Sequence, residues 1–170
     1  MKIDGNAVLP ASPADVWALL TDPTRLAHLL PGCERLDPDG PDRFKAAVKF
    51  AVAAISGNYA GTLEFVEKKP PHSLILKLDG KGLPGFVTGQ GKIELASHGG
   101  DTEVHYSGEA QVGGMIAAVG QRLIEGVARK IVQQFFDSAT AELRSAARST
   151  EPEPQPAASK SAGKTRRKKN

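Results

Sequence analysis

The side chains that most often perform catalysis are few and scattered in this 170-residue sequence. Its histidines are His28, His72, His98 and His105, and no two of them have the close spacing of a helical metal site. The single cysteine, Cys33, follows Pro-Gly in a predicted turn, and no base nearby in the sequence would activate its thiol. The sequence contains neither a Walker loop nor a nucleophile elbow. We therefore predict no catalytic residue, no metal site and no enzymatic activity.

Apolar side chains form a more informative pattern. Apolar residues alternate over 43–56, 59–66, 73–81, 86–95 and 102–112, as in strands that cover one face of an antiparallel sheet. On three of these segments the apolar face carries residues with little or no side chain, which are Gly80 and Gly82, Gly89 and Gly91, and Gly108 and Ala110. Glycine inside a strand often marks a bend or a close approach. Sheet curvature is therefore one explanation, and a cavity left by missing side chains is the other.

A cavity on this face would be largely apolar, which suits a hydrophobic ligand. Tyr59 and Tyr106 would be placed to orient a carbonyl or hydroxyl group. The residues that we expect to bind the ligand are Phe50, Tyr59, Leu63, Phe65, Leu76, Leu78, Phe86, Tyr106, Met115, Val119 and Leu123.

Charge is distributed unevenly along the chain. The whole sequence has 22 Lys and Arg against 19 Asp and Glu, a net charge of +3. The last twenty residues hold six bases and two acids, so they carry +4 and the preceding 150 residues carry −1. A near-neutral body excludes a basic nucleic-acid-binding domain, and nucleic acid is not an expected partner.

The basic tail and one apolar turn together predict membrane binding. Each Lys or Arg near an anionic leaflet contributes about 1 kcal/mol, and stable attachment needs a second signal. The turn at 82–86 offers one, because it presents apolar side chains where turns are normally polar. The predicted membrane-binding residues are Leu83, Phe86, Lys164, Arg166, Arg167, Lys168 and Lys169. The alternatives are a turn that folds back onto the core, and a tail that serves solubility or docks a protein or nucleic acid.

Strand and helix signals predict the scaffold for these residues. Residues 2–9 alternate as a strand, and Ser12 followed by Pro13 is a helix start. Asp22-Pro23 begins a second short helix, and after Gly113-Gly114 the apolar period becomes helical from about 115 to 146. Helices segregated from one antiparallel sheet define an α+β class.

The chain is predicted to form one folded domain, residues 1–148, followed by a disordered Pro-rich and then basic tail, residues 149–170. A single cysteine excludes an internal disulfide bond. The N-terminus lacks the apolar stretch of a signal peptide, and no apolar run is long enough to span a bilayer. We therefore expect a cytoplasmic protein.

Several motifs carry a resemblance to a known family. They are Ile3-Asp4-Gly5, Ser12-Pro13-Ala14-Asp15-Val16-Trp17, Leu30-Pro31-Gly32-Cys33-Glu34, Gly57-Asn58-Tyr59-Ala60-Gly61, Gly89-Gln90-Gly91 and Gly120-Gln121-Arg122-Leu123-Ile124 with Arg129-Lys130 and Gln134-Phe135-Phe136. Over residues 2 to about 146 the chain resembles the CoxG family, the G subunit of carbon monoxide dehydrogenase, in the START/Bet v 1-like (SRPBCC) superfamily. The resemblance implies a helix-grip fold: a curved antiparallel sheet wrapped around a long C-terminal helix, with two short helices after the first strand.

The resemblance also implies a function. It points to a non-catalytic accessory protein of a CO dehydrogenase-type molybdenum hydroxylase, which would link that enzyme to the inner face of the cell membrane. A noncovalently bound respiratory quinone, menaquinone or ubiquinone, or another lipid would fit the apolar cavity, because such an enzyme passes electrons to a membrane acceptor. The alternatives are a membrane-recruitment adaptor without a ligand, and a polyketide cyclase-like enzyme or general lipid carrier on the same fold.

Overall fold

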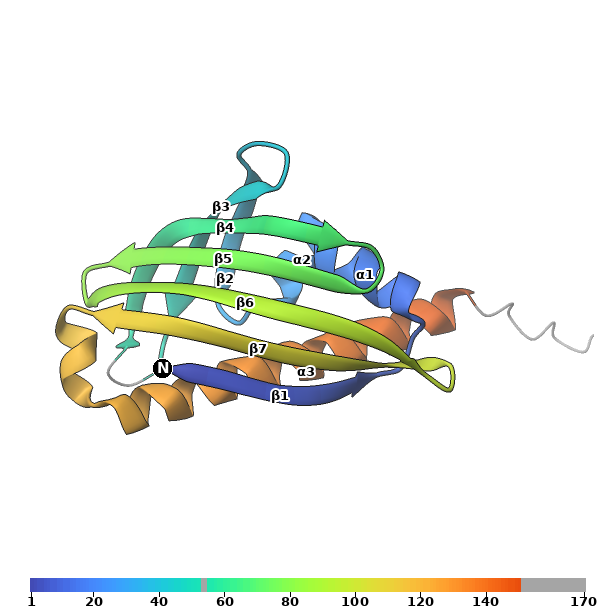
Figure 1. Cartoon of the computed structure of the whole chain (residues 1–170). Coiled ribbons are helices and arrows are strands. Elements are labelled where there is room, and N and C mark those ends of the chain that lie inside the picture. The colour runs from blue at the N-terminus through green and yellow to red at the C-terminus, as the bar shows by residue number, and fades with distance from the viewer. Residues whose placement is uncertain (53–54, 151–170) are drawn as a thin grey trace, which may run out of the picture.

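A computed structural model describes residues 1–52 and 55–150. Its strands form one antiparallel sheet in the order β1-β7-β6-β5-β4-β3-β2, which curves over the long helix α3 (Figure 1). The elements are β1 (Lys2–Leu9), α1 (Pro13–Thr21), α2 (Pro23–Leu29), β2 (Cys33–Pro38), β3 (Arg43–Phe50), β4 (Gly57–Lys69), β5 (Ser73–Gly82), β6 (Gly85–His98), β7 (Asp101–Gly113), the 3₁₀ helix η2 (Met115–Val119) and α3 (Gln121–Thr150). The predicted helix-grip, α+β architecture is confirmed.

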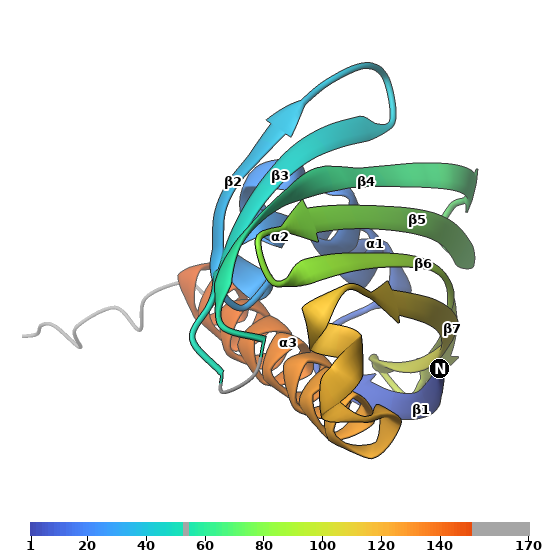
Figure 2. The same cartoon turned by 90° about the vertical axis from the view of Figure 1, so that its left-hand side faces the viewer.

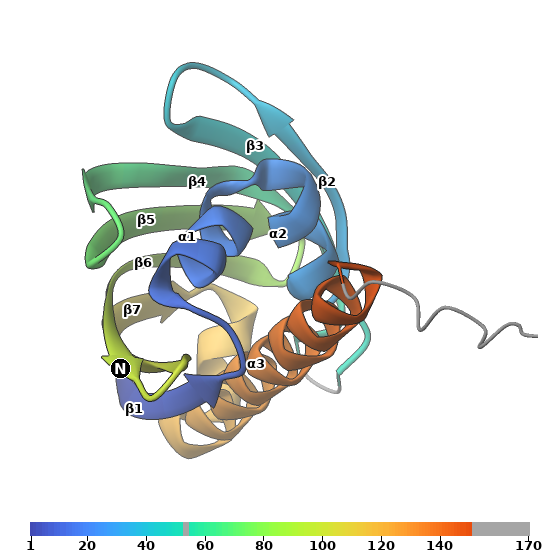
Figure 3. The same cartoon turned by 90° about the vertical axis from the view of Figure 1, so that its right-hand side faces the viewer.

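The two short helices begin where the sequence predicts them. The Ser12 side chain caps α1 by accepting a hydrogen bond from the Asp15 N–H at 3.3 Å. Asp22 caps α2 in the same way, and its carboxylate accepts the Thr24 N–H at 3.0 Å. A proline follows each cap at the first helical positions, where its missing N–H costs nothing. Figure 3 shows both helices inside the curve of the sheet, at the end where α3 finishes.

The core lies between these helices, the sheet and the C-terminal half of α3. Phe44 and Phe65 pack edge-to-face within it, with ring centroids 5.6 Å apart. The buried residues that form this cluster are Leu9, Val16, Leu19, Leu20, Leu26, Leu29, Leu36, Phe44, Phe65, Leu74, Leu95, Val104, Ala139 and Leu143. We call the face of the sheet that bears them the inner face, and the opposite face the outer face.

The sequence pattern does not predict strand β2, and it overestimates the length of β3. The sequence of β2, Cys-Glu-Arg-Leu-Asp-Pro, buries only Leu36, because the strand lies at the edge of the sheet and pairs with β3 alone. Its register shifts between Cys33 and Arg35, which further disrupts alternation. Cys33 therefore begins a strand instead of lying in a turn. Strand β3 ends at Phe50, whereas the alternation extends to 56.

The predicted continuous helix from 115 is interrupted. A short 3₁₀ helix, η2, comes first, and Gly120 then adopts φ 101° before α3 begins at Gln121. A positive φ takes the backbone out of the helical region. The apolar residues keep their helical spacing across this break, so the sequence pattern alone does not reveal it. Helix α3 spans 30 residues, which is about 45 Å at ~1.5 Å per residue. No helix of the described residues is long and apolar enough to cross a membrane.

Candidate functional site

The inner face has a tightly packed half and a loosely packed half. In the described part of α3, the two fully buried side chains are Ala139 and Leu143, both in the C-terminal half. Helix α3 packs mainly against β1 and α2, and Figure 2 shows it crossing the open side of the curved sheet. Its N-terminal half therefore faces the sheet without close packing.

Apolar side chains in this loosely packed half stay accessible. Leu78 lies on the inner face of β5, two residues beyond Leu76, yet 40% of its surface is exposed. Leu123, in the first turn of α3, is 48% exposed, but it lies seven residues before the exposed Lys130 and so shares the solvent-facing side of the helix. Apolar surface that remains uncovered on the inside of a fold is the kind of lining that a hydrophobic ligand covers.

The inner-face glycines differ in the space they leave, and Gly89 and Gly108 are intermediate, because an added Cβ would lie 3.0 and 3.1 Å from a backbone oxygen of the neighbouring strand. At Gly80 and Gly91 an added Cβ would meet its nearest atoms at 3.4 and 3.5 Å, which is ordinary contact. At Gly61 and Gly82 it would collide with the backbone of the neighbouring strand. Close approach of strands therefore accounts for Gly61 and Gly82, whereas the missing side chains of Gly80 and Gly91 leave usable space.

Tyr59 closes one wall of this region. Its hydroxyl donates to the Ile55 carbonyl at 2.9 Å, and its ring packs edge-on against Phe50 with centroids 5.7 Å apart. Burial raises the pKa of the Tyr59 phenol above its ordinary value. The hydroxyl predicted to orient a ligand is thus already engaged by the backbone.

Tyr106 lies at the other side of the inner face. Its ring stacks on Phe136 of α3 with centroids 5.1 Å apart, and its phenol end lies over Gly5, where any side chain would collide with it. It lines a groove of about 440 Å³ between β1 and α3 that also presents Arg129 and Asp137. Its hydroxyl has no hydrogen-bond partner within residues 1–52 and 55–150, so it can still bind a polar group of a ligand in this groove.

The remaining predicted ligand-binding residues lie in different places. Phe65 is fully inside the core, and Leu63 and Leu76 pack against that core. Phe86 lies on the outer face, where its ring covers Gly113 of β7. It shares that face with Thr88 and Gln90, so it does not point into the loosely packed half. Val119 is half-buried in η2.

The turn between β5 and β6 and the 3₁₀ helix η2 form one apolar end of the molecule. Leu83 is 94% exposed and Met115 is 70% exposed. The Ile116 N–H donates to the Pro84 carbonyl at 2.9 Å, which fixes η2 against the turn. The turn therefore does not fold back onto the core, as one of the sequence interpretations required. The predicted membrane-binding residues Lys164, Arg166, Arg167, Lys168 and Lys169 lie outside the described residues.

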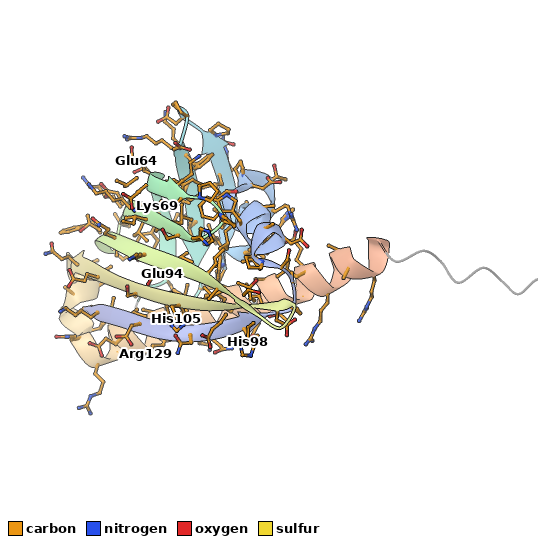
Figure 4. The ribbon with its side chains drawn as sticks, turned by 45° about the vertical axis from the view of Figure 1, so that its right-hand side comes forward. Glu64, Lys69, Glu94, His98, His105 and Arg129 are labelled. Carbon is orange, nitrogen blue, oxygen red and sulfur yellow. The ribbon has the colours of Figure 1, made fainter. Side chains whose placement is uncertain are left out.

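The titratable groups of the described residues offer no catalytic arrangement. Burial raises the pKa of the Cys33 thiol, and a backbone hydrogen bond of Arg35 only partly offsets this, so the unreactive thiol form is favoured. His105 pairs with Glu103 at 2.9 Å on the surface, and His98 lies nearby, as Figure 4 shows. Within the described ranges, no group of three or more potential ligands could hold a metal ion. The one buried polar side chain there is Thr102, whose hydroxyl donates to the Ala11 carbonyl.

The outer face carries a shallow polar trough of about 490 Å³ across five strands. Directly opposed residues form a row of alternating charge along it, from Arg43 through Glu64 to Lys77. Glu109 continues the row and pairs with Lys2 at 3.5 Å. Because these charges largely compensate one another, we interpret the trough as a solvated sheet surface.

Comparison with known proteins identifies a matching family and similar solved structures. The family model for CoxG, described as the G subunit of carbon monoxide dehydrogenase, matches residues 5–144. A conserved protein from Geobacillus kaustophilus is similar in structure with a TM-score of 0.84 and 34% identity, over 86% of this chain and 97% of that one. A START superfamily protein from Mycobacterium smegmatis has a TM-score of 0.71 at 8% identity, over 85% and 98% of the two chains, which shows the fold alone. A search of curated protein sequences finds no match.

Proposed function

The chain belongs to the CoxG family, that of the G subunit of carbon monoxide dehydrogenase, and from that premise we propose that it is a non-catalytic accessory protein of a CO dehydrogenase-type molybdenum hydroxylase. It binds a hydrophobic molecule between the sheet and α3 and links the enzyme to the cytoplasmic membrane. The observation that carries the proposal is the uncovered apolar surface of the inner face at Leu78, beside the space left by Gly80 and Gly91.

A respiratory quinone is the ligand that fits this arrangement best. Its isoprenoid chain needs an apolar lining, and its carbonyl groups need a hydrogen-bond donor near one end. The free hydroxyl of Tyr106 is one candidate donor among the described residues. A molybdenum hydroxylase that oxidises its substrate in the cytoplasm must pass electrons to such an acceptor, which supports quinone over an inert lipid.

The lack of an internal acid or base favours carriage over catalysis. A polyketide cyclase-like reaction needs a group that moves a proton inside the cavity. The described residues place no histidine, aspartate or glutamate in the buried set, where Thr102 is the one polar member. The cyclase alternative therefore has no buried acid or base within that part of the chain, and Asp137 lines only the groove between β1 and α3.

Native mass spectrometry of the full chain purified from membranes tests the ligand. We expect a noncovalent adduct with the mass of a quinone. Gly91→Leu adds a side chain to the open inner face and should remove the adduct, whereas Ala96→Leu, on the outer face of the same strand, should keep it. A wild-type protein that is consistently empty would contradict ligand binding.

Vesicle flotation tests membrane linkage separately. Leu83→Asp replaces an exposed apolar tip with a charge and should reduce flotation with vesicles of bacterial lipid. Val66→Asp changes a half-exposed apolar residue on β4, away from that tip, and should float like wild type. An empty protein that still floats would support the ligand-free adaptor, and unchanged flotation of Leu83→Asp would leave the tip without a role.

A further inference from the structure

The solvent-facing side of α3 carries basic residues towards both of its ends. Its exposed charged side chains are Arg122, Arg129, Lys130, Arg144, Arg148 and Asp137, five bases and one acid. Residues seven or fourteen apart point the same way on a helix of 3.6 residues per turn, so these bases form one stripe. The other two acids of the helix, Glu125 and Glu142, are half-buried on its flanks. We call this exposed face the α3 stripe.

None of the α3 stripe bases forms an ion pair within the described residues, whereas most bases of the sheet and its loops do, with Lys45, Lys49, Lys77 and Lys81 as exceptions. In the described residues, the sheet and its loops hold six ion pairs, among them Lys2 with Glu109 and Lys92 with Glu94. The one pair there that involves α3 joins Glu142 to Arg25 of α2 on the inward flank. Over residues 1–52 and 55–150, no base of the stripe pairs with an acid.

This arrangement makes the folded domain electrically two-sided. Residues 1–120 contain 11 Lys and Arg and 14 Asp and Glu, a net of −3. Residues 121–150 contain 5 and 3, a net of +2. Figure 4 shows Arg129 on the α3 side of the molecule, and Glu64 and Glu94 on the sheet. An anionic surface would therefore attract the helix side and repel the sheet side, which fixes an orientation.

The stripe also has the shape and the neighbours that a flat lipid surface requires. From Arg122 to Arg148 it runs about 39 Å along a straight helix. Exposed Leu123 lies at its start, close in sequence to exposed Met115, and its end at Thr150 leads directly into the tail that contains Lys164 to Lys169. The exposed apolar side chain of Leu123 therefore adjoins the first bases of the stripe.

We propose that the α3 stripe is the surface on which this protein lies on an anionic lipid bilayer, with the helix axis parallel to the membrane plane. The inference rests on the membrane linkage proposed above and assigns it a face of the folded domain. In this orientation α3 lies along the membrane, with the base of the tail at Thr150 at one end of the helix and the turn that bears Leu83 beyond the other end (Figure 1). The outer face of the sheet remains free for a partner enzyme.

The test measures binding of the full chain to vesicles of phosphatidylcholine and phosphatidylglycerol by co-sedimentation. Lys130→Gln with Arg144→Gln removes two stripe charges from exposed positions, and we expect affinity to fall about 25-fold, roughly fivefold for each charge. The matched control, Lys45→Gln with Lys77→Gln, removes the same net charge from the outer face of the sheet. It should bind almost as wild type does.

The possible outcomes distinguish failure of the stripe from failure of the proposed membrane linkage. A wild-type chain that ignores anionic vesicles would overturn both the stripe and the proposed membrane linkage. Equal losses in the stripe variant and the control, or no loss in either, would overturn the stripe alone. Tighter binding of the wild type to a mixed-sequence nucleic-acid duplex than to vesicles at equal salt, lost in the stripe variant, would reassign the stripe to nucleic acid.

A tryptophan probe supplies an orientation readout that charge removal cannot give. Gly126 lies in the stripe, and a Cβ added there would meet no atom within 4 Å. Gly126→Trp should therefore be tolerated, and its fluorescence should be quenched by vesicles that contain brominated lipid. Ala96→Trp, on the outer face of the sheet, should not be quenched. The reverse pattern would show that the sheet faces the bilayer and would contradict the proposal.

Discussion

Tyr59 and Tyr106 look equivalent in the sequence, but their hydroxyl groups differ in hydrogen bonding among the described residues. Both are predicted to line the cavity because each occupies an apolar alternation. The Tyr59 hydroxyl donates to the Ile55 carbonyl, four residues before it, whereas the Tyr106 hydroxyl has no such partner among the described residues and its ring is held by Phe136. Alternation assigns a side chain to a face of the sheet, but it does not tell which atom that side chain contacts.

Replacing each tyrosine by phenylalanine should therefore affect a different property, which is stability for Tyr59 and ligand retention for Tyr106. Tyr59→Phe leaves the Ile55 carbonyl without its donor, and we expect the free energy of unfolding to fall by about 1 kcal/mol. Tyr106→Phe removes a free hydroxyl and should leave stability unchanged while weakening ligand retention. Urea unfolding measures the first effect and native mass spectrometry the second. A stability loss at Tyr106 equal to that at Tyr59 would show that its hydroxyl has a structural partner.

At the scale of secondary-structure elements, the sequence predicts those that have a capping motif or a repeating apolar pattern, and it misses those that have neither. The caps Ser12 and Asp22 and the five alternating strands are predictable because each imposes a local pattern. Strand β2 has one buried residue, so it has no period to detect. The α3 stripe escapes prediction for a different reason: its bases are visible in the sequence, but the helix also contains three acids, and only burial shows that two of them lie on the flanks.

The break between η2 and α3 gives a prediction at this scale. Gly120 adopts φ 101° and ψ 145°, a conformation that is essentially restricted to glycine, while Gly126 is helical; a side chain at either has free space. Gly120→Ala should therefore reduce the free energy of unfolding by about 1–3 kcal/mol. Gly126→Ala should raise it by about 0.5–1 kcal/mol, because alanine favours the helix. Thermal unfolding of the pair checks both signs, and a neutral Gly120→Ala would indicate that η2 and α3 can merge into one helix.

For the whole molecule, the decisive feature is that the apolar end and the base of the tail lie at opposite ends of α3. Helix α3, which is about 45 Å long, lies between them, so a tail acting alone would fix only one end of the molecule at the bilayer. If the stripe lies on the membrane, the length of α3 contacts it, and the folded domain contributes its own share of binding. Since the tail carries +4 and the exposed face of α3 five bases against one acid, the two contributions are comparable.

Truncation after Thr150 separates these contributions. The core cluster ends at Leu143, so the shortened chain should unfold at the temperature of the full chain. It should bind phosphatidylglycerol vesicles more weakly than the full chain, yet retain a salt-sensitive affinity, because the stripe bases remain. Adding Lys130→Gln and Arg144→Gln to the truncated chain should remove most of that residual binding. A truncated chain that is folded and no longer binds would instead make the tail the sole electrostatic contact and leave the helix without a membrane role.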